Sequence, residues 1–211
     1  MAEKIIMEGS LKFIILLIFS YLVGSINFAR IFSKLKQIEL PKGLNPGAAT
    51  VFMNISKRAG IFTALADAGK GILPVVVAKW YLKNSIFSGP TFWAMIALMA
   101  IIGHCYPIFY NFIGGRGLAT SAGFIFSFFP YQVLSILPLY LFLIFYYKEN
   151  LSLAALICIP LIFFAIVFSS GWLELFNFLP GFFIVLLFMF FRNYDRAKDL
   201  KERLAFILNK E

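Results

Sequence analysis

The stretch SLKFIILLIFSYLVGSINFARIF, residues 10–32, decides the fold class. Its only charged residues are Lys12 near the start and Arg30 near the end. A bilayer core about 30 Å thick is crossed by a helix of about 20 such residues. The stretch is longer than a signal-peptide core, and no small-residue cleavage site follows it. We therefore predict a retained transmembrane helix here.

The rest of the chain has the same character. Of its 211 residues, 61% are hydrophobic and 14% are charged, and the mean hydropathy is +0.87. This composition excludes an ordinary soluble domain. Six further apolar segments follow, at residues 60–82, 91–112, 117–129, 131–147, 151–169 and 173–191. We predict an all-α polytopic bundle of about seven transmembrane helices, in one integral membrane domain over residues 1–211. Pro130 either separates two short helices or kinks one long helix, and we favour two helices.

Lys and Arg are distributed unevenly around these segments, and cytoplasmic loops normally carry the excess. With seven spans, residues 34–58, 113–117, 148–150 and the tail 192–211 lie on one side. That side, with Arg30, holds fourteen Lys and Arg, and the other side holds four. We therefore predict a multi-pass protein of the bacterial inner membrane, with the N-terminus outside and the C-terminus cytoplasmic. The tail fits either a helix on the membrane surface or a solvated helix.

The net charge of +9 comes from basic residues that lie between apolar stretches. This placement favours membrane lipids and anionic substrates as partners, and not nucleic acid. Cys105 and Cys158 both lie in apolar segments without the spacing of metal ligands or of a disulfide framework, so we expect packing roles. We expect no metal and no cofactor.

Asp67 and Lys70, in the segment DAGKG, are ionisable residues within an apolar span. Each costs several kcal/mol there unless it is paired or faces a polar cavity. Three residues apart on a helix, they share a face and can pair with each other. A structural ion pair and a functional pair are both open readings, and the small neighbours Gly69 and Gly71 favour close approach of a ligand or backbone.

Two glycine-rich segments fall on the predicted cytoplasmic side. The first is Gly114-Gly115-Arg116-Gly117, shortly after His104, and the second is GLNPGAAT at residues 43–50. Consecutive glycines before a helix can direct several backbone N–H groups at one anion, and Arg116 adds a full charge. Either segment alone would be an ordinary turn, and His104 alone a structural histidine. Together with Asp67 and Lys70 they predict an anion site at the cytoplasmic interface.

At these residues the sequence resembles the bacterial acyl-phosphate:glycerol-3-phosphate acyltransferase family, PlsY. The resemblance runs nearly end to end and is carried by five segments: YLVGSI at residues 21–26, NPGA at 45–48, DAGKG at 67–71, GHCYPIFYNFIGGRGLAT at 103–120 and LSLAA at 151–155. It implies a seven-helix membrane enzyme that moves an acyl chain from acyl phosphate to glycerol 3-phosphate. The product would be lysophosphatidic acid, made without a covalent enzyme intermediate.

With this chemistry in view, we expect Lys70, Arg116 and the glycine-loop amides to bind phosphate, with Asp67 orienting Lys70. Either His104 or the substrate's own phosphate would take the proton of the attacking hydroxyl. The predicted catalytic residues are Asp67, Lys70, His104 and Arg116. The predicted phosphate-binding residues are Gly43, Asn45, Gly47, Thr50, Gly114, Gly115, Gly117, Thr120, Arg192 and Arg196.

The chain departs from the family pattern at several positions. Met53 stands where the first family motif has arginine, and Lys57 or Arg58 could replace that charge. The same motif has Gly43 for serine, Leu44 for glycine, Ala49 for threonine and Thr50 for asparagine. Arg116 replaces a lysine, and Asn193 and Arg196 replace the histidine and asparagine of the last motif. Two alternatives therefore stand beside the working enzyme: a divergent member that binds lipid phosphate without turnover, and a small-solute transporter.

Overall fold

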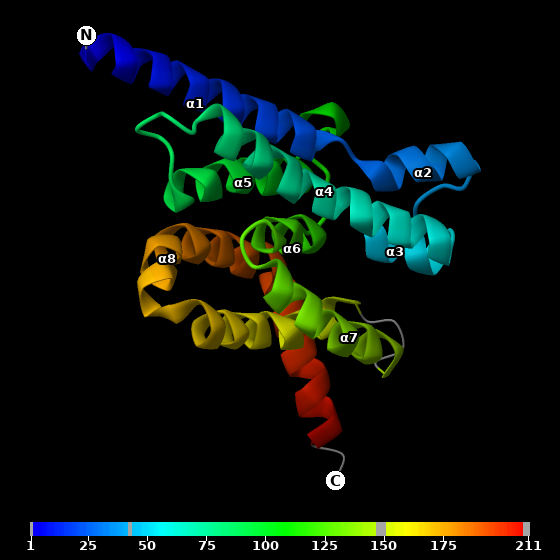
Figure 1. Cartoon of the computed structure of the whole chain (residues 1–211). Helices are drawn as coiled ribbons and strands as arrows, with labels where there is room; N and C mark the ends of the chain where they lie inside the picture. The colour runs from blue at the N-terminus through cyan, green and yellow to red at the C-terminus, as the bar shows by residue number, and fades with distance from the viewer. Residues whose placement is uncertain (1, 42–43, 147–150, 209–211) are drawn as a thin grey trace.

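The computed structural model describes residues 2–41, 44–146 and 151–208, and these are helical apart from their connections. The helices are α1 (Ala2–Ser25), α2 (Phe28–Lys36), α3 (Ala48–Asn54), α4 (Lys57–Tyr81), α5 (Pro90–Cys105), a 3-10 turn η1 (Ile108–Tyr110), α6 (Leu118–Phe126), α7 (Pro130–Tyr146) and α8 (Leu151–Leu208). In Figure 1, α1, α4 and α5 lie together in the upper part of the view, and α7 and part of α8 lie in the lower part. α6 lies between these two groups. The predicted all-α fold is confirmed.

The first predicted span is wrong at its C-terminal end. The helix stops at Ser25, and a new helix, α2, begins at Phe28. Asn27 caps α2, because its side-chain oxygen accepts a hydrogen bond of 3.0 Å from the Arg30 backbone N–H. This capping starts a second helix in a new direction and leaves the backbone between the two helices free of helical bonding. The break is important for the site described below.

The predicted number of seven spans is not confirmed. By length and composition, four stretches among the described residues can cross a membrane: Glu3–Lys36, Lys57–Tyr81, Pro90–Tyr110 and Asn177–Tyr194. Pro130–Leu143 is a shorter apolar helix. The segment predicted at residues 34–58 as an irregular loop contains the short helix α3.

The second half of the chain differs most from the predicted segments. α6 has only 9 residues, so at 1.5 Å per residue it extends roughly 14 Å, about half a bilayer core. α7 begins at Pro130, which favours the first position of a helix, so the prediction of two helices at this proline is confirmed. The two predicted spans at 151–169 and 173–191 belong to one helix, α8, which changes direction along its length in Figure 1.

Glycines allow the helix backbones to touch where they cross. A Cβ on Gly24 of α1 would lie 2.1 Å from the carbonyl oxygen of Ala100 on α5, and one on Gly103 would lie 2.2 Å from that of Tyr21. On the other side of α4, a Cβ on Gly71 would lie 2.0 Å from the Thr120 carbonyl oxygen of α6. Close contacts of this kind hold helices together in a bilayer, where apolar burial gives no driving force. They fix α1, α4, α5 and α6 against one another.

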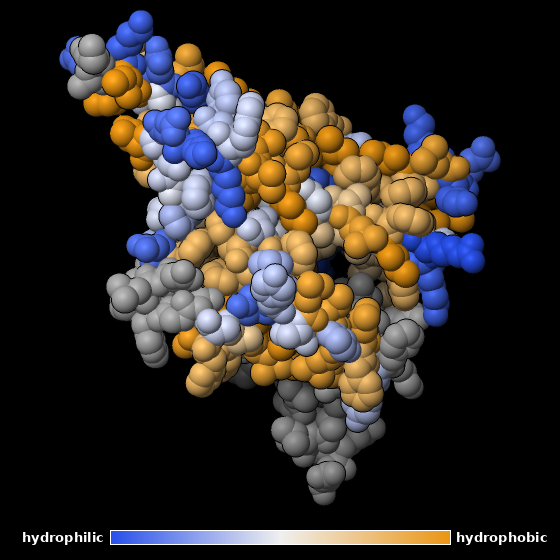
Figure 2. Space-filling model, in the orientation of Figure 1, coloured by the Kyte–Doolittle hydropathy of each residue, from blue (hydrophilic) through white to orange (hydrophobic). Residues whose placement is uncertain are grey.

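The outer surface is apolar, as expected of a protein that faces lipid. Large hydrophobic side chains are exposed along α1, α4 and α7, for example Ile18, Leu65 and Phe142. Figure 2 shows hydrophobic residues across the middle of the visible face, with hydrophilic ones gathered near the N-terminus and at the end of α2. An apolar band between two polar ends is the pattern of a membrane-spanning bundle. The chain is therefore a multi-pass membrane protein.

Candidate active site

Asp67, Lys70 and His104 meet in the interior and form what we call the ion cluster. The Lys70 Nζ lies 2.7 Å from Asp67 Oδ1 and 3.3 Å from His104 Nδ1. The same Asp67 oxygen lies 3.5 Å from His104 Nδ1. All three side chains are buried, at 2%, 3% and 6% exposure. At such burial each charge needs a partner, and the cluster supplies it.

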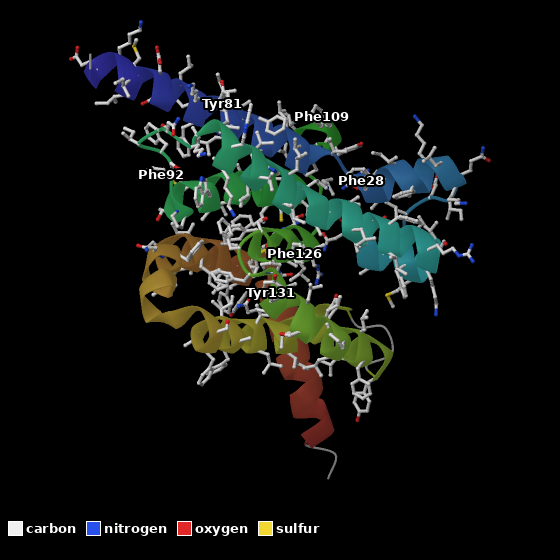
Figure 3. The ribbon with its side chains drawn as sticks, in the orientation of Figure 1. Phe28, Tyr81, Phe92, Phe109, Phe126 and Tyr131 are labelled. Atoms are coloured by element: carbon white, nitrogen blue, oxygen red, sulfur yellow. The ribbon has the colours of Figure 1, made fainter. Side chains whose placement is uncertain are left out.

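The ammonium group of Lys70 also donates to backbone carbonyl groups at the break between α1 and α2. Its Nζ lies 2.6 Å from the carbonyl oxygen of Ile26 and 3.5 Å from that of Gly24. Phe28, at the start of α2 beside α4 in Figure 3, has its ring 5.2 Å from the same nitrogen. An ammonium group has three N–H bonds. The protein's own acceptors use all three, so the predicted role of Lys70 as a phosphate ligand lacks a free donor.

The two ring nitrogens of His104 face different parts of the site. Nδ1 lies 3.3 Å from the Lys70 Nζ, a donor, and 3.5 Å from Asp67 Oδ1, an acceptor, so the tautomer decides which of the two it binds. The Nε2 side of the ring faces Gly115, because a Cβ on that glycine would lie 2.1 Å from Nε2. His104 thus connects the ion cluster to the glycine-rich segment that follows α5.

Residues 113–117, which we call the glycine turn, are attached directly to the ion cluster. The Gly115 N–H donates a 3.0 Å hydrogen bond to the His104 carbonyl. A side chain at Gly114 would collide with that carbonyl at 2.1 Å and with Pro107 at 2.5 Å. Gly117 has a φ of +82°, in the left-handed region that favours glycine, and begins α6 as its N-cap. The turn thus requires glycine at 114 because of the His104 carbonyl, at 115 because of the His104 ring, and at 117 because of the positive φ.

The N-terminus of α6 faces out of the glycine turn without a side-chain cap. The first backbone hydrogen bond after the turn is that of Ser121 to the Gly117 carbonyl, so the preceding N–H groups have no helical acceptor. Thr120, in this first turn of α6, is fully buried, and its hydroxyl has no hydrogen-bond partner. Free N–H groups and the positive end of the helix dipole together favour an anion.

The second glycine-rich segment lies beside the first. A Cβ on Gly47 would lie 4.0 Å from the Gly115 Cα, so the two loops touch as predicted. The Thr50 hydroxyl donates a 2.7 Å hydrogen bond to the Asn45 carbonyl, which closes the segment on itself. The Asn27 amide holds it from the other side through the Pro46 carbonyl, at 3.3 Å. Thr50 therefore shapes this loop, and its hydroxyl proton is already used.

Two arginines from different helices reach the glycine turn. Arg192 of α8 donates a 3.2 Å hydrogen bond to the Gly115 carbonyl, and Arg30 of α2 donates one of 3.4 Å to the Ile113 carbonyl. The Arg192 guanidinium also lies 4.9 Å from the ring of Tyr106. In each arginine Nε is buried without a hydrogen-bond partner. Among the described residues, neither guanidinium has a carboxylate within ion-pair distance.

Arg30 is absent from the predicted site residues. Sequence reasoning counted it only as a loop charge, because the helix break at Ile26 and Asn27 was not expected. Its signal was nevertheless available, since an arginine inside an apolar stretch normally marks function. Arg116 follows the glycines and is partly buried. Gly43 and the side chain of Arg196, both predicted to bind phosphate, lie outside the described residues.

Met53 and its charged neighbours Lys57 and Arg58 lie at the junction of α3 and α4. Met53 is 57% exposed at the end of α3. Lys57 and Arg58 are exposed at the start of α4, and Lys57 lies 5.7 Å from the Phe52 ring. None of the described contacts of these residues reaches the glycine turn. Within the described ranges, no group of three His, Cys, Asp or Glu could hold a metal ion.

Comparison with known proteins identifies the family of the chain. The family profile described as glycerol-3-phosphate acyltransferase matches residues 14–203. The chain is 37% identical to the glycerol-3-phosphate acyltransferase of Albidiferax ferrireducens over 72% of this chain and 68% of the relative. It is 38% identical to that of Pseudomonas aeruginosa over 70% of this chain and 76% of the relative.

Solved structures give the same result. The crystal structure of PlsY (YgiH), an integral membrane glycerol 3-phosphate acyltransferase, in its lysophosphatidic acid form has a TM-score of 0.75 and 28% identity, and covers 90% of this chain and 92% of that one. The glycerol 3-phosphate form of the same protein has a TM-score of 0.74 with the same coverage. The chain therefore belongs to the glycerol-3-phosphate acyltransferase family.

Proposed function

We propose that this membrane acyltransferase transfers a fatty acyl group from acyl phosphate to the hydroxyl of glycerol 3-phosphate, giving lysophosphatidic acid for phospholipid synthesis. Family membership makes it a glycerol-3-phosphate acyltransferase. One observation carries the site assignment: the glycine turn combines an uncapped helix N-terminus with two arginines, Arg30 and Arg192, that have no carboxylate partner among the described residues. Such a site is built for phosphate groups.

In the proposed reaction the hydroxyl oxygen of glycerol 3-phosphate attacks the carbonyl carbon of acyl phosphate. A new ester C–O bond forms, the bond between the carbonyl carbon and the phosphate oxygen breaks, and inorganic phosphate leaves. The hydroxyl proton passes to the departing phosphate, because His104 Nδ1 lies between Lys70 and Asp67 and Nε2 lies against Gly115. Arg192 and the N–H groups of α6 stabilise the developing charge.

We assign Asp67, Lys70 and His104 to positioning. Together they hold the break after α1, the end of α5 and the glycine turn in one arrangement. Arg116, Arg192 and the N–H groups at the N-terminus of α6 bind phosphate. The protein lies as a single domain in the bacterial inner membrane, with the site facing the cytoplasm, as the distribution of Lys and Arg supports.

The enzyme is tested with purified protein in detergent, acyl phosphate and glycerol 3-phosphate, following release of inorganic phosphate. We expect release only when the acceptor is present, and its loss in Arg192→Gln. Substituted positions such as Met53 keep one alternative in view, a member that binds lipid phosphate without turnover. Background release together with measurable binding of lysophosphatidic acid would favour that alternative.

Orientation is tested by cysteine labelling, because Cys105 and Cys158 are both buried and give little background. Lys36→Cys, at the exposed end of α2, should react with a membrane-impermeant maleimide only after the cells are permeabilised. Lys83→Cys, exposed after α4, should react in intact cells and serves as the matched control. The reverse pattern would contradict a cytoplasmic site.

A further inference from the structure

The proposed reaction brings two phosphorylated substrates into one site, and both carry negative charge. Sequence reasoning assigned Lys70, Arg116, Arg192 and Arg196 as the cations that neutralise it. The N–H groups of Lys70 are, however, directed to the Ile26 carbonyl, Asp67 and His104. The site is therefore one cation short of the expected set. Among the described residues, the side chains that hydrogen-bond the glycine turn are those of Arg30 and Arg192.

The contacts of Arg30 leave most of its guanidinium N–H donors available to an anion. Its guanidinium uses one Nη2–H for the Ile113 carbonyl at 3.4 Å and lies 5.2 Å from the Tyr110 ring. These contacts hold the group in place without neutralising it. A guanidinium has five N–H donors in a planar fork that matches two phosphate oxygens. Four donors remain, and the buried Nε is among them.

A structural role would give Arg30 a carboxylate partner, since a partly buried charge without one is unfavourable. Asp67, which lies close to the break before α2, is paired with Lys70 instead. The Arg30 side chain is also directed to residue 113, just before the glycines, while Arg192 reaches residue 115 from α8. The two guanidinium groups thus contact different residues of one turn.

We propose that Arg30 binds the phosphate monoester of glycerol 3-phosphate, at a subsite distinct from that of Arg192. The inference rests on the proposed function and deepens it. α2 carries Lys34 and Lys36 exposed at its polar end, so this side of the turn attracts a soluble dianion. Arg192, in contrast, lies on an apolar helix that packs against α5, which suits the substrate with the acyl chain.

The test compares Arg30→Gln, Arg30→Lys and, as the matched control, Lys36→Gln, which removes one charge from the same helix without contact to the turn. Initial rates give KM for glycerol 3-phosphate and for acyl phosphate separately. We expect Arg30→Gln to raise KM for glycerol 3-phosphate ten- to hundredfold and KM for acyl phosphate less than threefold. Arg30→Lys should lie between wild type and Arg30→Gln, because it keeps the charge and loses the fork. Lys36→Gln should change either KM less than twofold.

Titration calorimetry with glycerol 3-phosphate alone makes the result independent of turnover. If the wild type binds glycerol 3-phosphate but shows no phosphate release, the proposed function fails, and weaker binding by Arg30→Gln still supports the subsite. Unchanged KM and unchanged binding in Arg30→Gln would overturn the inference. A rise confined to the KM of acyl phosphate would overturn it as well. A melting temperature in detergent equal to that of wild type shows that each variant is folded.

Discussion

The ion cluster and the glycine turn are joined by one backbone hydrogen bond, yet they treat charge in opposite ways. In the cluster, the charges of Asp67 and Lys70 compensate each other, and backbone carbonyls take the remaining donors. At the turn, Arg30 and Arg192 bind carbonyls, and in the described part of the chain neither has a carboxylate partner. Compensated charges commonly hold a structure together, and uncompensated ones commonly bind a ligand. The difference supports the proposed division into positioning residues and substrate-binding ones.

The largest effect is expected from Lys70→Met, which leaves Asp67 buried without its cation. Removing one partner of a buried pair costs about 3 to 5 kcal/mol, so we expect a large drop in melting temperature and loss of activity. The double variant Asp67→Asn with Lys70→Met removes both charges and should recover much of the stability.

That double variant also separates the two roles of Lys70. If Lys70 only positions the turn, the recovered protein should still bind glycerol 3-phosphate by calorimetry. Absence of binding in a stable double variant would return Lys70 to the phosphate ligands. His104 is the one histidine of the sequence, so a single ¹⁵N-histidine spectrum reports the cluster. A protonated Nδ1 would show that the ring donates to Asp67, and an unprotonated Nδ1 that it accepts from Lys70.

Arg192→Gln tests the other side of the comparison. We expect it to raise the KM for acyl phosphate ten- to hundredfold. This change corresponds to about 1.5 to 3 kcal/mol, the contribution of one charge-assisted hydrogen bond. Its melting temperature should stay close to that of wild type, because no ion pair is broken. A large loss of stability without a change in KM would place Arg192 among the structural residues.

Gly115→Ala tests the connection between the two regions. The new Cβ would lie 2.1 Å from His104 Nε2, and this ring is held by Lys70, so it cannot move freely. Forcing a methyl group into such a packed site costs about 1 to 3 kcal/mol. We expect reduced stability, measured by thermal melting, and a fall in kcat larger than the change in either KM.

The smallest effect is expected from Gly69→Ala, the control for Gly115→Ala. A Cβ at Gly69 meets nothing within 4 Å. Alanine in a helix interior is favoured over glycine by about 0.5 to 1 kcal/mol, so the melting temperature should rise slightly and activity should persist. Loss of activity here would show that a substrate uses the space beside Gly69.

Much of the fold and part of the site could be predicted from the sequence. The length and hydropathy of the apolar segments predict a membrane bundle, because bilayer thickness sets the length of a spanning helix. The polar motifs were expected to meet, as Lys70, His104 and Gly115 do. The break at Ile26 and Asn27 could not be predicted, because hydropathy does not register a change of direction. Arg30 and the saturation of Lys70 both depend on that break. The count of seven spans is not confirmed, because an apolar segment such as α6 can be short and still buried among its neighbours.

The shortness of α6 has a consequence for how the protein is made. A helix of 9 residues cannot leave the insertion machinery for lipid alone, because its ends would carry unsatisfied backbone groups into hydrocarbon. It must enter together with α7 and find the surface of α4, where Gly71 contacts the backbone of α6 and Gly123 of α6 contacts the backbone of α4. The glycine turn precedes α6 directly, so it takes its final shape only once that docking is complete. Assembly of the bundle therefore comes before competence to bind substrate.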